Sequence, residues 1–439
     1  MSEASQATDR PSEFPFLAPD RPLDKCLPPR IADAVAAHAA MYGEPAVNVA
    51  AAAMCLMAAC ARCVLRPASR NRRATGMVFN LMPVLPPGRH GAPWIDHLVA
   101  ACRPSLEFND ALHRRGETGV YHNMQLGLVG YPTPSPLTKC MRPSELMRDP
   151  DPGGASTRLY VNPGANPVDE LRRLSPWERG ELLRLLSLAW EGEPVNAGDG
   201  PRALDVAMLA PVEPASAAEM LAWLDAAVTP PPFVILRCGA SPPVAGGSQE
   251  SFRPTDFIDP ILLGRPAPPR PVPLGADADA ELERLEEQIA ARLLELNRPA
   301  LSRHLRFVPG LIRRLLVLLA ALCPGGIVEP AKEEAECLAM AKGLVFHIAM
   351  AHIAALRTLT SGFTAATGDR TGDPAETIAE LMLLAKIREL GPVTRSKLRG
   401  RLSDRQRREL NRRLAILLDR RKVEIDGRGR LRASREWGG

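Results

Sequence analysis

The pattern of apolar and polar positions predicts two helical sections, one on each side of a middle section that alternates strands with a helix. Residues 29–68 carry apolar residues, mostly alanine, at helical spacing from the segment LPPRIADAVAAHAAMYG onward. Residues 278–360 are predicted to be helical again. In that section five apolar residues keep the period of one helix face: Leu282, Leu285, Ile289, Leu293 and Leu296.

The middle of the chain, residues 69–240, alternates predicted strands with a predicted helix. Four short apolar runs predict strands: GMVFNLMPVL, TRLYVN, ALDVAMLAPV and PPFVILRC. The segment SPWERGELLRLLSLAWEG predicts a helix with Ser175 as N-cap and Glu178 at the capping-box position. Strands that alternate with helices imply a largely parallel sheet. We therefore expect an α/β core in a chain that is mainly helical overall.

Two further segments are polar or rich in proline and glycine. Residues 1–28 are predicted to be a flexible N-terminal arm, and residues 241–277 a linker or loop. The arm lacks the apolar core of a signal peptide, and the most apolar stretch, residues 49–61, is too short to span a bilayer. A cytoplasmic protein without membrane contact is expected.

The C-terminal segment predicts three helices followed by a β-hairpin. The helices begin after the capping residues Asp373, Thr394 and Ser403, and Asp426-Gly427 supplies the turn of the hairpin VEIDGRGRLRAS. Helix, helix, helix and β-wing is the order of a winged-helix domain, here over residues 373–434. This pattern is more specific than any of the sequence patterns found earlier in the chain.

Charge sets this C-terminal domain apart. The whole chain has a net charge of +5, but residues 395–432 hold fifteen Lys/Arg against five Asp/Glu, so the rest is net acidic. In the third helix Leu410, Leu414 and Leu417 form an apolar stripe with Leu418, which leaves three arginines on the opposite face. That is the face that a recognition helix presents to the major groove of duplex DNA. A solvated basic helix or a protein-docking winged helix is the alternative interpretation.

The candidate DNA-binding residues come from all three parts of this domain. They are Arg395, Lys397, Arg399 and Arg401 in the second helix, Arg405, Arg408 and Arg412 in the third, and Arg428, Arg430 and Arg432 in the wing.

The segment MPVLPPGRHGAPWIDHLV, residues 82–99, has the layout of a phosphate-binding loop between a strand and a helix. The motif G-x-x-x-x-G-K-[ST] places Pro86, Gly91, Ala92 and Pro93 at its fixed positions, so the lysine and the hydroxyl are missing. Without them no ammonium reaches the phosphates and no hydroxyl holds Mg²⁺.

The order of other segments extends this comparison. They are LPPRIADAV near the start, LLSLAWEGEPVNAGDG followed by ALDVAMLAPVEPASAAEMLAWL, and RHLRFVPGLIRRLLVLLAAL with IVEPAKEEAECLAMA at the back. Their order resembles the uncharacterised RecA-like ATPase family of prophages, plasmids and related mobile elements, often described as primase-helicase-like. The family's W-x-G segment and E-P turn are matched by Trp190, Gly192 and Glu213-Pro214.

The resemblance also implies which catalytic parts are lost. The acid pair that the family carries after an apolar strand is replaced by Asn162 and Pro163, and the arginine expected before the last strand falls at Pro232, with Arg237 at the far end. Phosphoryl transfer depends on positioning and charge neutralisation, so a degenerate ATPase core is implied. A Pro-rich α/β protein that never bound nucleotide fits the same residues.

Other candidate chemistry is sparse. The histidines His90, His97, His113 and His122 lack the spacing of two ligands on one helix face, and the pair Cys60 and Cys63 lies in an alanine-rich helix without a second pair. We expect buried thiols and solvated or hydrogen-bonded histidines, with no catalytic residue, metal or cofactor.

Together these patterns favour a DNA-binding protein of mobile-element replication or helicase type, which acts by binding and assembly. DNA, duplex in the first instance, is the expected partner, with a homo-oligomer or an active helicase as further partners. A DNA-dependent ATPase with an atypical loop, or a winged-helix transcriptional regulator, remains the alternative.

Overall fold

The computed structural model describes the larger part of the chain, with gaps. The described residues are 14–61, 65–68, 76–77, 79–89, 91–102, 127–129, 157–161, 167–196, 201–203, 205–227, 231–239, 252–253, 270–295, 304–322, 334–365, 383–384, 386–387, 390–402, 410–411, 413–415, 417–418, 423–426 and 429–433.

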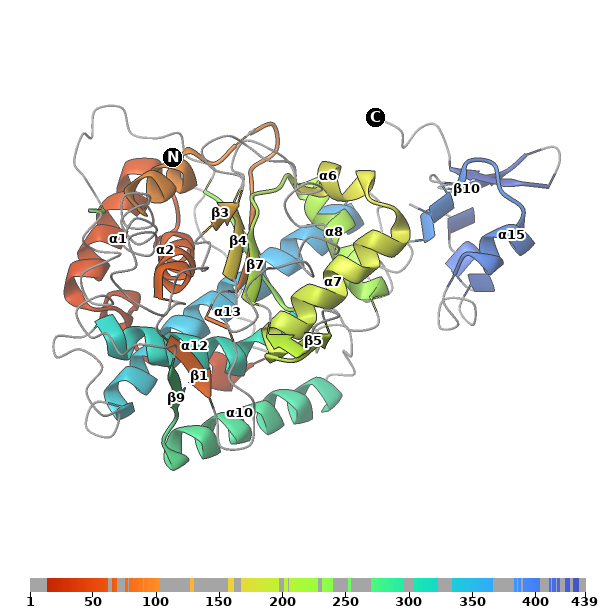
Figure 1. The fold of residues 1–439 in the computed structure, drawn as a ribbon. Helices are drawn as coiled ribbons and strands as arrows, with labels where there is room; N and C mark the ends of the chain where they lie inside the picture. Colours follow the sequence, from red (N-terminus) through yellow and green to blue (C-terminus); the bar gives the residue numbers. More distant parts are fainter. Residues whose placement is uncertain are drawn as a thin grey trace.

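A five-stranded parallel sheet forms the centre of the molecule, in the order β3-β4-β7-β2-β8 (Figure 1). Its strands are β3 (Gly127–Val129), β4 (Thr157–Val161), β7 (Asp205–Leu209), β2 (Asn80–Val84) and β8 (Phe233–Arg237). The four apolar runs of the sequence are the strands β2, β4, β7 and β8, so their prediction and that of a parallel sheet are confirmed.

A buried amide ties β2 to both of its neighbouring strands. Asn80 at the start of β2 donates from Nδ2 to the Pro232 carbonyl (3.0 Å), and its Oδ1 accepts from the Met208 amide (3.1 Å). The side chain thus pairs both of its polar ends inside the sheet, as a buried amide must.

Alternate residues of the strands face two different cores. Leu81, Leu209 and Val234 belong to one buried cluster, whereas Met82 and Ile235 belong to a second on the other face. This alternation follows from the two-residue period of a strand. Since both faces are covered by helices, the strands read as continuous apolar runs.

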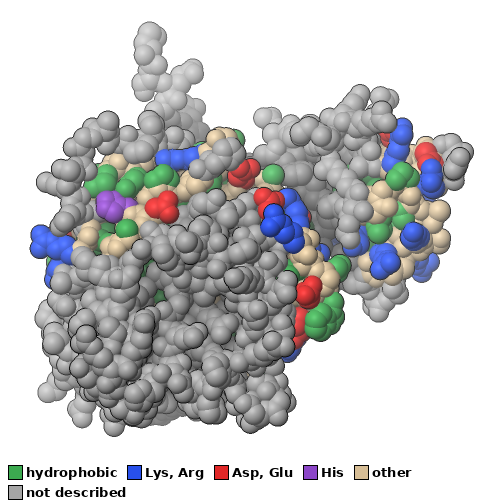
Figure 2. Space-filling view, turned by 45° about the horizontal axis from the view of Figure 1, so that its top comes forward, with side chains coloured by type: hydrophobic (Ala, Val, Ile, Leu, Met, Phe, Trp, Pro, Cys, Tyr) green, Lys and Arg blue, Asp and Glu red, His purple; other side chains and the backbone are tan. Residues whose placement is uncertain are grey.

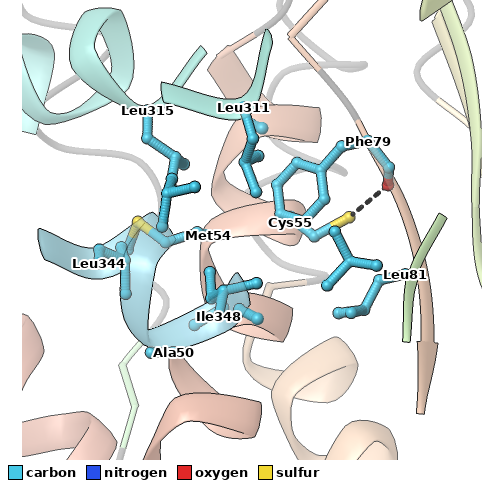
Figure 3. Packing of buried hydrophobic residues seen from close by; sticks show 14 of the residues in the cluster. Ala50, Met54, Cys55, Phe79, Leu81, Leu311, Leu315, Leu344 and Ile348 are labelled. Carbon is cyan, nitrogen blue, oxygen red and sulfur yellow. Dashed lines mark hydrogen bonds between the residues drawn. The ribbon is translucent and has the colours of Figure 1, made fainter. Parts of the chain in front are cut away.

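The first face of the sheet is covered by long apolar helices. They are α1 (Pro29–Tyr42), α2 (Ala46–Ala61), α12 (Phe307–Leu322) and α13 (Glu334–Ala365), with the amphipathic α10 (Ala276–Glu295) outside them. Figure 3 shows Met54 of α2, Leu315 of α12 and Leu344 of α13 converging in this core. Cys55 of α2 donates from its thiol to the Phe79 carbonyl (3.3 Å). The two helical sections predicted from the sequence therefore pack together in one core.

The second face is covered by α6 (Pro167–Arg173), α7 (Pro176–Glu191) and α8 (Pro214–Ala226). Ser175 and Glu178 form the predicted capping box at the start of α7, and Gly192 ends the helix with φ 70°. The short antiparallel pair β5 (Pro194–Asn196) and β6 (Pro201–Ala203) follows α7.

Three boundaries predicted from the sequence need correction. Residues 14–28 are no flexible arm: they form the 3₁₀ turns η1 (Pro15–Leu17) and η2 (Leu23–Cys26), and Phe14 and Leu17 are buried in the first core. The end of the first helical section is the strand β1 (Leu65–Ala68). It pairs with β9 (Arg270–Pro273), inside the predicted linker, because distant segments supply each other's backbone partners.

One described helical segment, Glu334–Leu359, is long and apolar enough to cross a membrane. Of the most apolar 18-residue stretch of this segment, 67% is buried inside the protein. The segment belongs to α13, which packs against α12 and β8.

The C-terminal region has a small core of its own, around residues such as Ile387, Leu398, Leu414 and Leu431. Its described elements include α15 (Arg395–Gly400) and the antiparallel strands β10 (Val423–Ile425) and β11 (Leu431–Ala433). Val393 adds an antiparallel bridge to Leu431.

The caps and turns of this region bear out one prediction and correct another. Thr394 caps α15 as predicted, accepting from the Lys397 amide (3.4 Å). The hairpin turn is longer than the predicted Asp426-Gly427 pair: the Asp426 amide donates to the Arg430 carbonyl (2.8 Å), and Gly429 takes the left-handed position. A three-residue loop with a left-handed glycine closes a hairpin in this way. Asp373 and Ser403 lie outside the described residues.

Candidate functional site

The loop after β2 emerges at the carboxyl end of that strand, between the ends of β7 and β8. The Arg89 amide donates to the Pro86 carbonyl (3.1 Å), and Gly88 has φ 77°, so Pro86 to Arg89 form a tight turn of type II form. Gly91 has φ 97°, a conformation that favours glycine.

The helix after this loop, over residues 93–102, offers little to a phosphate. Ala92 is 1% exposed at the position where the motif has lysine. The amides of Ile95 and Asp96 both donate to the Ala92 carbonyl, at 2.8 and 3.1 Å. Pro93 has no N–H. Most of the donors that a helix N-terminus would aim at an anion are thus missing or used within the helix.

A buried carboxylate lies between the loop and the end of β8. Glu44 follows α1, where Gly43 ends the helix with φ 61°, and its Oε2 accepts from the Gly239 amide (2.7 Å). Its Oε1 lies 3.6 Å from Nη1 of Arg89, and this arginine also donates from Nη1 to the Gly239 carbonyl (3.3 Å). Asn48 of α2 donates to the Arg237 carbonyl (2.8 Å). These contacts fasten the loop, the end of β8 and the α1–α2 turn together.

Burial governs the titration of this group of side chains. Burial raises the pKa of Glu44 above its ordinary value, while the Gly239 amide, the Arg89 charge and the Asn48 side chain oppose that rise. The pKa of the neighbouring Cys238 is also raised, first by burial and then by the negative charge of Glu44. The thiol therefore stays protonated at neutral pH and is no nucleophile.

The contact of Glu44 with Arg89 and the Gly239 amide was not predicted from the sequence. Arg89 lies inside the loop that resembles a phosphate-binding loop, but its role depends on Glu44, which is 45 residues upstream. The turn Gly43-Glu44-Pro45 between two helices was the only local signal. Of the other residues compared with the ATPase motifs, Arg237 is exposed at the end of β8, Pro232 is buried, and Asn162 and Pro163 lie outside the described residues.

Four of the predicted DNA-binding residues lie on or directly after α15 and are exposed: Arg395, Lys397, Arg399 and Arg401. Leu398, between them, is buried in the C-terminal core, which fixes the side of the helix that faces inward. In the described part of the chain no salt bridge involves Arg395, Lys397 or Arg401. Figure 2 shows Lys and Arg side chains in blue on the C-terminal region at the right.

The described arginines of the β10–β11 hairpin form ion pairs, unlike three of the residues at α15. Arg430 donates from Nε to Oδ2 of Asp426 (2.9 Å), and Arg432 donates from Nη2 to Oε2 of Glu424 (2.9 Å). Both pairs are local, so each arginine's charge is partly offset by a neighbour in the hairpin. Arg405, Arg408, Arg412 and Arg428 lie outside the described residues.

Histidines and cysteines of the described chain are tied into the structure. The Tyr42 hydroxyl and His97 Nδ1 are 2.7 Å apart, and His38 Nε2 lies 2.9 Å from the Trp94 carbonyl oxygen. Cys26, Cys55, Cys102, Cys238 and Cys337 are buried free thiols. No group of three or more potential metal ligands occurs among the residues described. His90, His113, His122 and Cys63 lie outside these residues.

Comparisons of this chain with protein-family models, with curated proteins and with solved structures gave no match.

Proposed function

We propose that this chain is a DNA-binding protein in which a RecA-like core without ATPase activity carries a C-terminal winged helix. The exposed basic residues on α15 carry the proposal. Four cations lie on one short segment, and its helix packs into the C-terminal core through Leu398. Three of the four have no ion-pair partner in the described protein. Unpaired surface cations gathered on one small domain attract a polyanion.

The strand order supports the RecA-like part of the proposal. β2, which precedes the loop, lies between β8 and β7, and β7 separates it from β4. A RecA-like core has this arrangement, with one strand between the loop strand and the strand that bears the acid pair. The loop also lies at the carboxyl ends of the strands, the edge at which open α/β sheets bind ligands.

Duplex DNA binding by the full chain tests the proposal directly. We expect a labelled 30-base-pair duplex to bind the purified protein at 50 mM salt, with an affinity that falls linearly in a plot of log K against log salt concentration. Fluorescence anisotropy measures both. Affinity without salt dependence, or no binding at all, would contradict a basic phosphate-contacting surface.

We expect no ATP hydrolysis above background, with or without DNA. Ala92 is buried where a lysine would bind the phosphates, and Pro93 replaces the hydroxyl that would hold Mg²⁺. Phosphate release measured on successive purification fractions is the test. Activity that is stimulated by DNA and co-purifies with the chain would favour the DNA-dependent ATPase instead.

The regulator alternative predicts another outcome. A dimer that reads two half-sites gains specificity from base contacts, so it would prefer one short palindromic site strongly over random duplex. The assembly role, as a homo-oligomer or beside an active helicase, requires no such preference.

A further inference from the structure

A negative charge is buried at the edge of the sheet where a ligand would be expected. The side chain of Glu44 is 0% exposed, and its Oε1 makes no hydrogen bond within the protein. A buried carboxylate is costly unless it is paired and hydrogen-bonded. Glu44 meets this requirement chiefly through the Gly239 amide and the nearby Arg89.

The backbone around this carboxylate is closely packed. A Cβ placed on Gly239 would lie 2.2 Å from the Gly43 carbonyl oxygen and 3.4 Å from Cα of Glu44. The end of β8 and the α1–α2 turn therefore touch, and only glycine fits at position 239. This contact delivers the Glu44 side chain to a fixed place beside the loop after β2.

The groups that hold Glu44 are those that bind a phosphate. A guanidinium and a backbone amide converge on its two oxygens, at 3.6 Å and 2.7 Å. They lie at the carboxyl end of the central parallel strands, in the usual ligand-binding region of such sheets.

We propose that Arg89 and the Gly239 amide form an oxyanion pocket that Glu44 occupies from within. The carboxylate stands in for a phosphate group, holds the loop after β2 against β8, and keeps phosphate-bearing ligands out of this pocket. The inference goes beyond the absence of hydrolysis, because it predicts that inorganic phosphate binds once the carboxylate is removed. It does not depend on DNA binding.

The variant Glu44→Ala in the full chain tests this pocket, with inorganic phosphate as the probe. We expect the variant to be destabilised and phosphate to restore part of the loss, relative to chloride at equal ionic strength. If phosphate binds with a dissociation constant of about 10 mM, 100 mM phosphate lowers the unfolding equilibrium constant about tenfold. Chemical denaturation in the two salts measures this ratio.

Three controls separate a specific pocket from the general stabilisation that phosphate gives to proteins. The wild type and Glu44→Gln keep the pocket filled, and Glu44→Ala/Arg89→Gln lacks the cation. All three should gain only the smaller, common effect. An equal gain in all four proteins would overturn the proposal.

A second measurement applies if Glu44→Ala does not fold. It is a double-mutant cycle of Glu44→Gln and Arg89→Gln that compares unfolding equilibrium constants. If the two side chains form an ion pair, the constant of the double variant should be at least about fivefold smaller than the two single effects combined predict. Additive effects would show that Glu44 and Arg89 do not act as a pair, and would overturn the pocket.

Discussion

Replacing the four basic residues on and directly after α15 is expected to raise the Kd for duplex DNA about 100-fold at 50 mM salt, since non-specific binding is almost entirely electrostatic. The variant is Arg395→Gln, Lys397→Gln, Arg399→Gln and Arg401→Gln. Glutamine keeps much of the side-chain length and suits a helix. All four side chains are exposed, so folding should be unaffected. The plot of log K against log salt should lose up to about 3.6 from its slope, at about 0.9 for each phosphate contact.

A matched variant distinguishes this surface from a general loss of charge. The matched variant changes four exposed arginines outside the C-terminal region to glutamine, which removes the same charge: Arg173, Arg253, Arg284 and Arg357. We expect that variant to keep most of the affinity. Equal losses in the two variants would show that net charge alone governs binding.

A third variant tests the role of the predicted third helix. Changing Arg405, Arg408 and Arg412 to glutamine should reduce the salt slope if they contact phosphates. If they read base edges, the loss is about 1–3 kcal/mol on a preferred sequence with little change in slope. If neither this variant nor the α15 variant changes affinity, the C-terminal region is better interpreted as a protein-docking module.

The strands and the best-marked helices could be predicted because their signals are local. The run FVILR is apolar throughout until its final arginine, and a strand covered on both faces requires this. Ser175 and Glu178 are three residues apart and satisfy each other's backbone groups, so their pattern marks a helix start without any tertiary contact.

Contacts between distant segments could not be predicted. Phe14 is buried although the segment before it is polar, because α-helices far along the chain supply its surroundings. The pairing of Leu65 with Arg270 and the meeting of Glu44 with Arg89 depend in the same way on the complete fold. In the C-terminal hairpin, the arginines could be identified from the sequence, but their pairing with Glu424 and Asp426 could not.

The buried histidine beside the middle of β8 gives the second large effect, on stability at acid pH. His352 of α13 is 0% exposed, and its Nδ1 accepts from the Ile235 amide (2.9 Å). Phe307 packs edge-on against its ring, with centroids 5.1 Å apart. Burial, and secondarily the neighbouring His304, lower the pKa of His352 from 6.5 to about 3. The folded protein therefore keeps this ring neutral where the unfolded chain protonates it.

The sign of the pH dependence follows from that difference. Above pH 6.5 both states hold the ring neutral and the protein has its full stability. Between pH 6.5 and about 3 only the unfolded state binds the proton, so the free energy of unfolding falls by about 1.4 kcal/mol for each pH unit through this group.

Replacing His352 with asparagine isolates this contribution, because the asparagine side chain offers an acceptor to the Ile235 amide but does not titrate. We expect His352→Asn to be less stable than the wild type at pH 7, by about 2–4 kcal/mol for the lost ring volume. The difference should shrink by about 1.4 kcal/mol per pH unit between pH 6 and pH 4, where the variant lacks the proton-linked loss. Urea denaturation at half-unit pH steps measures both curves, and titrating groups that do not interact with His352 cancel in their difference. A difference that stays constant from pH 7 to pH 4 would mean that the folded protein accommodates a charged ring at this position.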